Sequence, residues 1–447
     1  RGVTTWDAPT TFAATWQRAV TTRPDASFLV FEASDGTVTE WTYAEFDSIV
    51  ARMATELTSH DVGPGRSVHV ALTNCPTFVA VWIAANRLGA WIVPSDPMGR
   101  TPELADHIGR TAPRAGFCSR DRADVYRPAA GEIAVFPIDE ADRELAWLPD
   151  EPFTDWPEPG LTDRAAVMFT SGTTGRPKGV EITQANYAFA GMVMATAADL
   201  APTDRQLVVL PLFHANAQYY SFASAIWVGA SVALMHTFSA SGFLPAVARH
   251  QATCASLFAA PIRMILARGA PDPGAEPGGL RHCWYAQNLA ADQYETFAEW
   301  SGCRPRQLYG MTETIPAVLT DRADDPRPDS MGFVTPHCEV DVTRSDGTSV
   351  EPGEVGEIVV RGERGIALFA GYLDDPDTTA SSHRDGWFRT GDRATRDADG
   401  RHHFDGRRSD VLKVAGENVS TVELETLLSQ HPRVFEAAVV GLCLMLI

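Results

Sequence analysis

The sequence predicts an α/β fold in which a large N-terminal domain is followed by smaller, strand-rich parts. Short apolar runs alternate with segments of helical periodicity over most of the chain. Short strands separated by Gly and Asp turns take over after about Gly332. With 447 residues, of which 45% are apolar, the chain can bury a large core and is too long for one ordinary domain.

The first part of the chain shows the pattern of parallel or mixed sheets joined by crossover helices. After Trp41, apolar residues recur at helical spacing until Gly63-Pro64-Gly65, which predicts an amphipathic helix: Phe46, Ile49, Val50, Met53 and Leu57. A buried strand, a helix and a second strand are then expected at 67–72, 76–88 and Trp91–Pro94. The same alternation returns at 206–210, 221–228, 231–236 and 242–250.

The last part of the chain predicts a smaller antiparallel or barrel-like subdomain. Its strands are expected at 338–344, 356–361 and 402–404. A helix at 422–428 and a strand at 434–441 then indicate the start of a small α+β domain that the chain does not complete. We therefore predict a large domain over 1–408, with a β-rich subdomain at 331–408, and the beginning of a small mobile C-terminal domain at 409–447.

Composition narrows the class of protein. Lys and Arg number 37 against 57 Asp and Glu, and a formal charge of −20 opposes binding of nucleic acid through a broad basic face. No cysteine pair has the close spacing of a zinc or thioredoxin-like site, so free thiols in a reducing cytoplasm are expected. No apolar run is long enough for a membrane span, and the first residues lack the layout of a secretory signal. The start at Arg1 and the abrupt apolar stop at 441–447 indicate that one or both ends are missing.

The clearest chemical motif follows an apolar strand that ends at Thr170. Its sequence is Ser171-Gly-Thr-Thr-Gly-Arg-Pro-Lys-Gly179. Hydroxyls and backbone amides freed by glycine can donate hydrogen bonds to phosphate oxygens, and Lys178 can offset their charge. The order is not that of the Walker motif, because Gly179 stands where that motif requires Lys. The alternative is a polar turn between two strands.

Residues 170–179 resemble the adenylate-forming superfamily of acyl- and aryl-CoA synthetases, luciferases and peptide-synthetase adenylation domains. Five further motifs match in the order of that family: Tyr309-Gly-Met-Thr-Glu-Thr314, Gly356-Glu-Ile, Gly371-Tyr372, Gly386-Trp-Phe-Arg-Thr-Gly-Asp392, and Gly406-Arg407 with 410–416. Chance matches at five ordered places are not plausible, and the similarity is nearest to stand-alone acyl-CoA ligases of the carnitine or crotonobetaine type.

The resemblance assigns roles to single residues. It gives Thr170 and Lys178 catalytic positions, and the nucleotide contacts comprise Ser171, Gly172, Thr173, Thr174, Gly175, Tyr309, Gly310 and Met311. Thr312 would contact phosphate and Glu313 would hold Mg²⁺, a hard cation that prefers carboxylate and phosphate oxygens. Asp392 would accept hydrogen bonds from the ribose hydroxyls, and Arg407 would contact ribose or phosphate. Taken alone, the Thr-Glu pair would be a helix cap and Asp392 a turn residue.

The end of the chain matches the joint at which, in this superfamily, a small C-terminal domain rotates between two half-reactions. Ser409 aligns with the hinge residue, although a plain linker is an equal interpretation. Lys413, Gly416 and Glu417 follow on the loop that faces the reactive centre when CoA is the acceptor. A glycine there leaves room for the pantetheine arm, because it has no Cβ.

His214 is the candidate gate between the acyl pocket and the pantetheine tunnel. It lies in Pro211-Leu-Phe-His-Ala-Asn-Ala-Gln218, which resembles the family's acyl-pocket entry, and the alternative is a core histidine. The small neighbours Ala215, Ala217, Ala259 and Ala260 would leave volume for a bulky acyl group if they line the pocket. In a chain rich in alanine they are also ordinary core residues.

Two features depart from the family. Where many relatives have Gly-Ala-Pro beside adenine, this chain has Trp284-Tyr-Ala-Gln-Asn288, so Ala286 and Gln287 are assigned to the adenine by position alone. The family's catalytic lysine lies deep in the C-terminal domain, beyond Ile447. Truncation or impairment of the first half-reaction are the two explanations, and the uncompleted strand at 434–441 favours truncation.

The implied reaction joins a small-molecule carboxylic acid to AMP and then transfers the acyl group to CoA, with ATP, Mg²⁺ and CoA as the required small molecules. One alternative acceptor is the thiol of an acyl-carrier protein. A peptide-synthetase role would call for a substrate-binding Asp near 213–219, and none is present. A catalytically silent nucleotide- or acyl-binding protein is the second alternative. The identity of the acid and the oligomeric state are left open.

Overall fold

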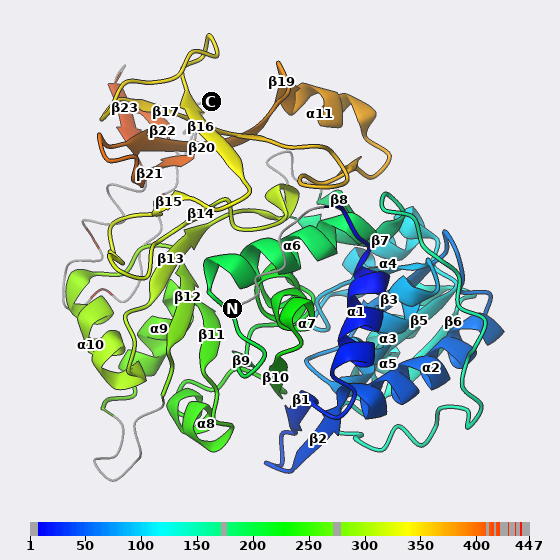
Figure 1. The fold of residues 1–447 in the computed structure, drawn as a ribbon. Coiled ribbons are helices and arrows are strands. Elements are labelled where there is room, and N and C mark those ends of the chain that lie inside the picture. The colour runs from blue at the N-terminus through cyan, green and yellow to red at the C-terminus, as the bar shows by residue number, and fades with distance from the viewer. Residues whose placement is uncertain are drawn as a thin grey trace, which may run out of the picture.

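Three sheets organise the computed structural model, which describes residues 8–170, 177–270 and 279–407, the backbone of 411–414 and 417–420, and three single residues further on (Figure 1). The largest sheet has nine strands in the order β15-β14-β13-β12-β11-β9-β10-β1-β2. Its strands are β1 (Ser27–Glu32), β2 (Val38–Thr42), β9 (Arg205–Val208), β10 (Ser231–Met235), β11 (Cys254–Phe258), β12 (His282–Ala286), β13 (Arg306–Tyr309), β14 (Leu319–Thr320) and β15 (Phe333–Val334). The pairs from β1 to β13 are parallel, and antiparallel strands close both edges.

The second sheet has seven strands in the order β18-β8-β7-β4-β3-β5-β6. They are β3 (Ser67–Ala71), β4 (Trp91–Pro94), β5 (Ala115–Ser119), β6 (Ala134–Ile138), β7 (Arg164–Thr170), β8 (Lys178–Thr183) and β18 (Gly371–Tyr372). The strands from β7 to β6 run parallel, whereas β8 and β18 are antiparallel to their neighbours. Because β18 comes from the late part of the chain, the predicted subdomain at 331–408 is joined to this sheet.

The helices lie against and between these sheets (Figure 1). They are α1 (Phe12–Thr22), α2 (Tyr43–Ser59), α3 (Pro76–Arg87), α4 (Thr101–Thr111), α5 (Ala123–Ala130), α6 (Gln184–Ala197), α7 (Ser224–Val228), α8 (Phe243–Arg249), α9 (Ala259–Leu266), α10 (Ala291–Ser301) and α11 (Pro376–Ser381). Short 3₁₀ turns form at Arg120–Arg122 and Thr312–Thr314, and a π-helix forms at Asn216–Ala223. Among the described residues, no helix is both long and apolar enough to cross a membrane.

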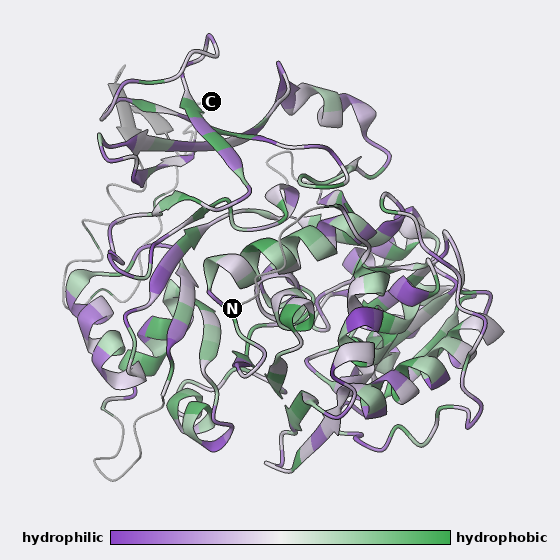
Figure 2. Cartoon of the chain, viewed as in Figure 1, coloured by the Kyte–Doolittle hydropathy of each residue, from purple (hydrophilic) through white to green (hydrophobic). Residues whose placement is uncertain are grey.

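Local sequence explains where these helices begin and which face they bury. The Thr42 hydroxyl accepts from the Glu45 amide (3.2 Å) and the Glu45 carboxylate accepts from the Thr42 amide (2.8 Å), a reciprocal cap that starts α2. The predicted apolar face of α2 is buried, as expected for an amphipathic helix. Helices α3 and α6 are instead apolar all round and buried between layers, which Figure 2 shows as green ribbon in the interior.

The third sheet is antiparallel and is formed by residues 339–407, with β18 of the second sheet inserted between its strands in the sequence. Its strands are β16 (Glu339–Thr343), β17 (Val355–Arg361), β19 (His383–Arg384), β20 (Trp387–Arg396) and β21 (His402–Arg407). A separate hairpin follows, made of β22 (Val411–Val414) and β23 (Glu417–Ser420). The prediction of an α/β fold with an antiparallel part near its end is therefore confirmed. Most of 422–428 and 434–441, where a helix and a strand are predicted, lies outside the described residues.

Candidate functional site

The predicted nucleotide residues gather at the carboxyl ends of parallel strands. Thr170 ends β7, Ala286 ends β12 and Tyr309 ends β13. Ligands of open α/β sheets bind at this end of the strands, because the connecting loops and helix starts converge there. The antiparallel sheet adds Asp392 from β20 and Arg407 from β21.

The predicted phosphate loop connects two antiparallel strands. Thr170 on β7 pairs with Lys178 on β8, and Phe169 pairs with Gly179. A Cβ on Gly179 would lie 3.0 Å from the Leu373 Cβ, closer than a Cβ ordinarily approaches, so glycine permits this packing. The hairpin therefore holds both ends of the loop in register. Ser171, Gly172, Thr173, Thr174 and Gly175 lie outside the described residues.

Lys178, Tyr372 and Glu313 form a connected group beside the loop. The Lys178 ammonium lies 4.7 Å from the centre of the Tyr372 ring. The Tyr372 hydroxyl donates to Glu313 Oε1 at 2.9 Å. A cation over an aromatic face and a hydroxyl on a carboxylate are both favourable contacts. The structure thus places the two charged residues that the sequence assigned to chemistry in contact with one tyrosine, Lys178 with its ring and Glu313 with its hydroxyl.

Glu313 is the buried carboxylate of the site. It is 5% exposed. Burial raises its pKa, while the hydrogen bond from Tyr372 and the charges of Lys178 and Arg407 act in the opposite direction. No group of three or more metal-ligating side chains occurs among the described residues. Mg²⁺ beside a nucleotide needs only one or two carboxylates together with phosphate oxygens, so Glu313 fits that donor set.

A strained turn holds Glu313 in place. Ile315 has φ 70° and ψ −81°, a conformation that β-branched residues rarely adopt, and it is fully buried. The Thr314 hydroxyl accepts from the Met311 amide (2.9 Å) and lies 3.1 Å from the Pro316 carbonyl oxygen. These contacts close the turn that carries Thr312 and Glu313. Strain of this kind persists only where surrounding packing determines the backbone.

Gly310 lies against the returning side of the same turn. A Cβ at this position would lie 2.9 Å from Ala317 Cα and 3.0 Å from the Tyr220 hydroxyl. Because one of these atoms belongs to the backbone, the clash could be relieved only by moving the turn. Gly310 therefore acts through packing, while Met311 supplies backbone contacts to Thr314.

The predicted ribose site is a three-residue group. Asp392 accepts from the Tyr309 hydroxyl at 2.7 Å and from Arg407 Nε at 2.7 Å. Asp392 is 3% exposed, and burial followed by the Asp392 charge raises the pKa of Tyr309. Each carboxylate oxygen has two lone pairs, so acceptor capacity remains for sugar hydroxyls. The pairing of β20 with β21 brings Asp392 and Arg407 together, and the hydrogen bond from Tyr309 joins them to the end of β13.

The residues assigned to adenine lie just after β12. Ala286 is half-buried, and Gln287 is exposed with φ 74°. The Gln287 carbonyl accepts from Gln307 Nε2 at 2.8 Å, which holds this unusual backbone conformation. Trp284 and Tyr285 are buried in the core. The loop therefore presents Ala286 and Gln287, rather than the preceding aromatic residues, toward solvent.

His214 lies on a separate loop before the π-helix. Its ring centre is 4.1 Å from that of Phe213, and the side chain is exposed. Loss of solvation lowers the pKa of His214, and Asp96 opposes this effect. Gln218 anchors the loop by donating to the Leu212 carbonyl at 2.6 Å and accepting from Tyr187. His214 is not bonded to the Glu313 group in the part of the chain that the structure describes, and its role as a gate stays a prediction.

The alanines near His214 divide into two kinds. Ala217 and Ala259 are buried in the core, whereas Ala215 and Ala260 are partly exposed. The burial of the first two is typical of core residues, and a role of any of the four in an acyl pocket stays a prediction. Of the remaining predicted residues, Lys413 is in β22, where only the backbone is described, while Gly416 and Ser409 lie outside the described residues.

Tyr372 is a site residue that the sequence motifs contained but did not assign. The Gly371-Tyr372 match was the available signal, and the tyrosine's contact with both Lys178 and Glu313 appears only when β18 pairs with β8. Arg110, in α4, is a second residue that the sequence did not assign: it contacts Pro177, and no recognised motif contains it.

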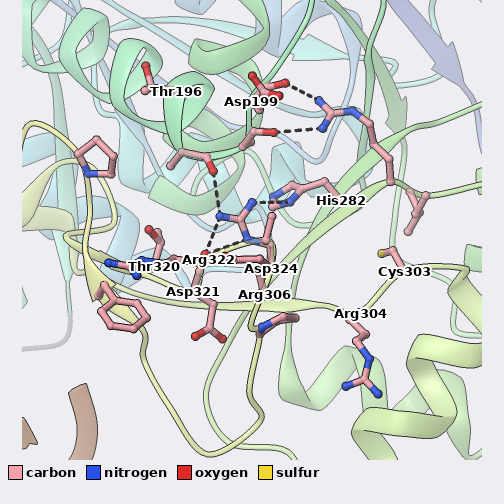
Figure 3. A pocket seen from close by; sticks show the side chains of 18 of the residues that line it. Thr196, Asp199, His282, Cys303, Arg304, Arg306, Thr320, Asp321, Arg322 and Asp324 are labelled. Carbon is pink, nitrogen blue, oxygen red and sulfur yellow. Dashed lines mark hydrogen bonds between the residues drawn. The ribbon is translucent and has the colours of Figure 1, made fainter. Parts of the chain in front are cut away.

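A cavity of about 850 Å³ lies at the other end of β12 and β13 (Figure 3). Arg306, at the start of β13, donates to the Ala197 carbonyl (2.9 Å) and the Asp321 carbonyl (2.6 Å), and burial lowers its pKa to about 10. Arg281 donates to Asp204 and to the Asp199 carbonyl. These arginines join the end of α6 to the sheet, and the cavity is separate from the predicted nucleotide residues.

Comparisons with known proteins agree with this geometry. Residues 16–373 match a family described as AMP-binding enzyme. The crotonobetaine/carnitine–CoA ligase of Salmonella arizonae is 32% identical over 434 residues, which cover 94% of this chain and 84% of the relative. ATP-bound MatB from Rhodopseudomonas palustris has a TM-score of 0.84 at 25% identity, covering 96% of this chain and 85% of that one. The O-succinylbenzoate coenzyme A synthetase of Bacillus subtilis, in complex with AMP, has a TM-score of 0.83 at 26% identity and covers 97% and 86%.

Proposed function

Because the chain belongs to the AMP-binding enzyme family, we propose that it activates a small-molecule carboxylic acid as acyl-AMP and then transfers the acyl group to CoA. The observation that carries the proposal is the placement of Lys178, Glu313 and Asp392 around one end of the parallel strands. ATP and CoA are the co-substrates. These residues supply a cation for phosphate, a buried carboxylate suited to Mg²⁺ and an acceptor for ribose.

In the first half-reaction, a carboxylate oxygen of the acid attacks the α-phosphorus of ATP. The new bond is a mixed anhydride, and the bond to pyrophosphate breaks. Lys178 and Arg407 stabilise the charge on the phosphate oxygens, while Asp392 and Tyr309 orient the sugar. Mg²⁺, held by Glu313, would supply further charge neutralisation when bound. Positioning and electrostatics suffice, so a nucleophilic side chain is not required.

In the second half-reaction, the CoA thiol, as its thiolate, attacks the acyl carbon of the adenylate. The carbon–oxygen bond to AMP breaks, giving a thioester and AMP. We assign Lys413 and Gly416 to the approach of the pantetheine arm and His214 to the gate between acyl pocket and thiol. Ser171 to Gly175 and Thr170 would enclose the phosphates during the first step.

The choice of CoA over a carrier protein rests on two supports. The relative from Salmonella arizonae is named a CoA ligase, and the segment 213–219 has no Asp to bind an α-amine. The alternative product is an acyl group bound as a thioester to an acyl-carrier protein. We place the reaction in the cytoplasm, because the six described cysteines are free thiols and suit a reducing compartment.

The decisive test is pyrophosphate release by the full-length protein against a panel of aliphatic, aromatic and polycyclic acids, with and without CoA. Products are followed by mass spectrometry. Acid-dependent pyrophosphate release together with acyl-CoA supports the proposal and names the substrate. Acyl-AMP that accumulates despite CoA would instead favour a carrier-protein acceptor. Absence of turnover with every acid would contradict both and favour a silent binding protein.

A further inference from the structure

Helix α4 contacts both ends of the predicted phosphate loop, although it belongs to a different part of the chain. Its residues Arg110 and His107 lie one helical turn apart and share a face. Arg110 reaches Pro177 at the end of the loop, and both side chains contact Phe169 just before its start. We propose that Arg110 and His107 are positioning residues that fix β7 at Phe169 and β8 at Pro177, so that Thr170 and Lys178 are held in place to bind the phosphates of ATP.

Arg110 joins the two ends of the loop directly. Its Nη1 donates to the Pro177 carbonyl at 2.8 Å, and its guanidinium carbon lies 4.7 Å from the centre of the Phe169 ring. Asp106 lies one turn earlier on the same helix, 3.4 Å from Nη1. The planar guanidinium can donate to a carbonyl while lying on an aromatic ring, which an ammonium group does less well. One side chain thus restrains the residue before Thr170 and the residue before Lys178.

His107 adds a second contact on the first end of the loop. Its ring lies parallel to Phe169, with 4.0 Å between centres and 2° between planes. His107 is 5% exposed, and its Nδ1 is 2.8 Å from the Ser95 hydroxyl. That hydroxyl is 2.9 Å from His69 Nε2, and His69 Nδ1 is 2.8 Å from the Tyr126 hydroxyl. The chain of contacts anchors His107 to strands β3 and β4 and to α5.

The arrangement matters because Phe169 and Pro177 directly precede Thr170 and Lys178, the described residues that the sequence assigns to the phosphates of ATP. A binding group that is already held in position loses less conformational freedom when the ligand arrives, which strengthens binding of ATP without any direct contact. The inference rests on the proposed adenylating function only in naming ATP as the ligand of Thr170 and Lys178.

The first test compares Arg110→Met with Arg114→Met. Arg114 is an exposed arginine just beyond α4, and it pairs with Asp61 rather than with Phe169 or Pro177. Calorimetric titration with MgATP, without acid or CoA, measures binding alone. We expect Arg110→Met to weaken MgATP binding about tenfold, the size of one lost charge-assisted hydrogen bond, and Arg114→Met to leave it unchanged. Steady-state assays should then show a higher KM for ATP with little change in the KM for the acid.

Variants of His107 separate stacking from folding. His107→Phe keeps a ring on Phe169 and loses the bond to Ser95, whereas His107→Ala loses both. We expect the Phe variant to bind MgATP nearly as the parent does and the Ala variant to bind it several-fold more weakly. Arg110→Lys serves as a milder change should Arg110→Met fail to fold.

The proposal is overturned if folded Arg110→Met or Arg110→Lys protein binds MgATP as tightly as the parent. It is equally overturned if these variants raise the KM values for ATP and acid to the same extent, because that would indicate a general structural role. Failure of the parent to form acyl-CoA would contradict the proposed function alone, since MgATP binding is measured without acyl substrate.

Discussion

At the scale of single residues, Glu313 combines burial with three stabilising partners. Burial raises its pKa, whereas Tyr372, Lys178 and Arg407 favour the ionised form. A carboxylate in such surroundings interacts strongly with a divalent cation, because few water molecules compete with it. The activity should be sensitive to substitution of Glu313. Among the described residues, no second carboxylate is hydrogen-bonded to Tyr372 that could take its place.

Replacing Glu313 with Gln should slow acyl-AMP formation by about 10²-fold or more, because a preorganised charge at the reacting phosphates is lost. Single-turnover quenched-flow with saturating ATP and MgCl₂ measures this step. Tyr372→Phe is the matched control, since it removes the hydrogen bond at Oε1 and keeps the carboxylate. It should lose much less activity, and equal losses in the two variants would contradict the assignment of Mg²⁺ to Glu313.

At the scale of elements, the turn between β13 and β14 positions several site residues at once. It contains the strained Ile315 and the hydrogen-bonded Thr314, and Gly310 packs on its returning side. The positions of Thr312 and Glu313 therefore depend on the backbone of the whole turn. A small displacement there would move Glu313, the carboxylate proposed for Mg²⁺, together with Thr312, the residue predicted to contact phosphate.

Gly310→Ala should reduce acyl-AMP formation more than it reduces stability. The added Cβ would lie 2.9 Å from Ala317 Cα, so the turn must shift. We expect at least a tenfold loss of kcat/KM with a fall in Tm of a few degrees, measured by pyrophosphate release and by calorimetry.

Gly109→Ala provides the control for that substitution. Gly109 lies inside α4, and a Cβ there meets no atom within 4 Å. Alanine in a helix interior should stabilise the protein by about 0.5–1 kcal/mol and leave activity unchanged. Full activity in Gly310→Ala would show that the turn tolerates displacement, against the expectation.

At the scale of the whole molecule, buried histidines couple stability to pH. Burial lowers the pKa of His69 to about 3 and the pKa values of His107 and His402 to about 4, and that of His282 also falls well below its ordinary value. The folded state therefore binds fewer protons than the unfolded state between about pH 6.5 and 4. Asp321, whose pKa burial raises to about 6, acts in the opposite direction over part of this range.

The free energy of unfolding should accordingly fall as pH decreases from about 6.5 toward 4, by up to about 1.4 kcal/mol per pH unit for each neutral histidine. Denaturant titrations at several pH values measure the slope. His402→Asn, which can still donate to the Gly332 carbonyl, should reduce that slope. A stability that stays constant from pH 7 to 4.5 would contradict the neutral buried state of these histidines.

Local patterns in the sequence were sufficient to predict the class of fold and to nominate the residues of the candidate site. The helical spacing from Phe46 to Leu57 predicts the buried face of α2, and the order of the motifs at Thr170, Tyr309 and Asp392 predicts a nucleotide site. These features are recognisable because each depends on residues close together in the chain, through helical periodicity, strand alternation or a short loop.

Tertiary structure alone decided which distant residues support that site. Tyr372 reaches Glu313 only because β18 pairs with β8, and Arg110 reaches Pro177 only because α4 packs beside the β7–β8 hairpin. Their spacing in the sequence contains no period and no motif that links them. The sequence by itself therefore determined the chemical groups that we assign to the nucleotide. The packing of sheets and helices determined the second set of contacts that hold those groups in position, because such contacts depend on distances across the folded chain.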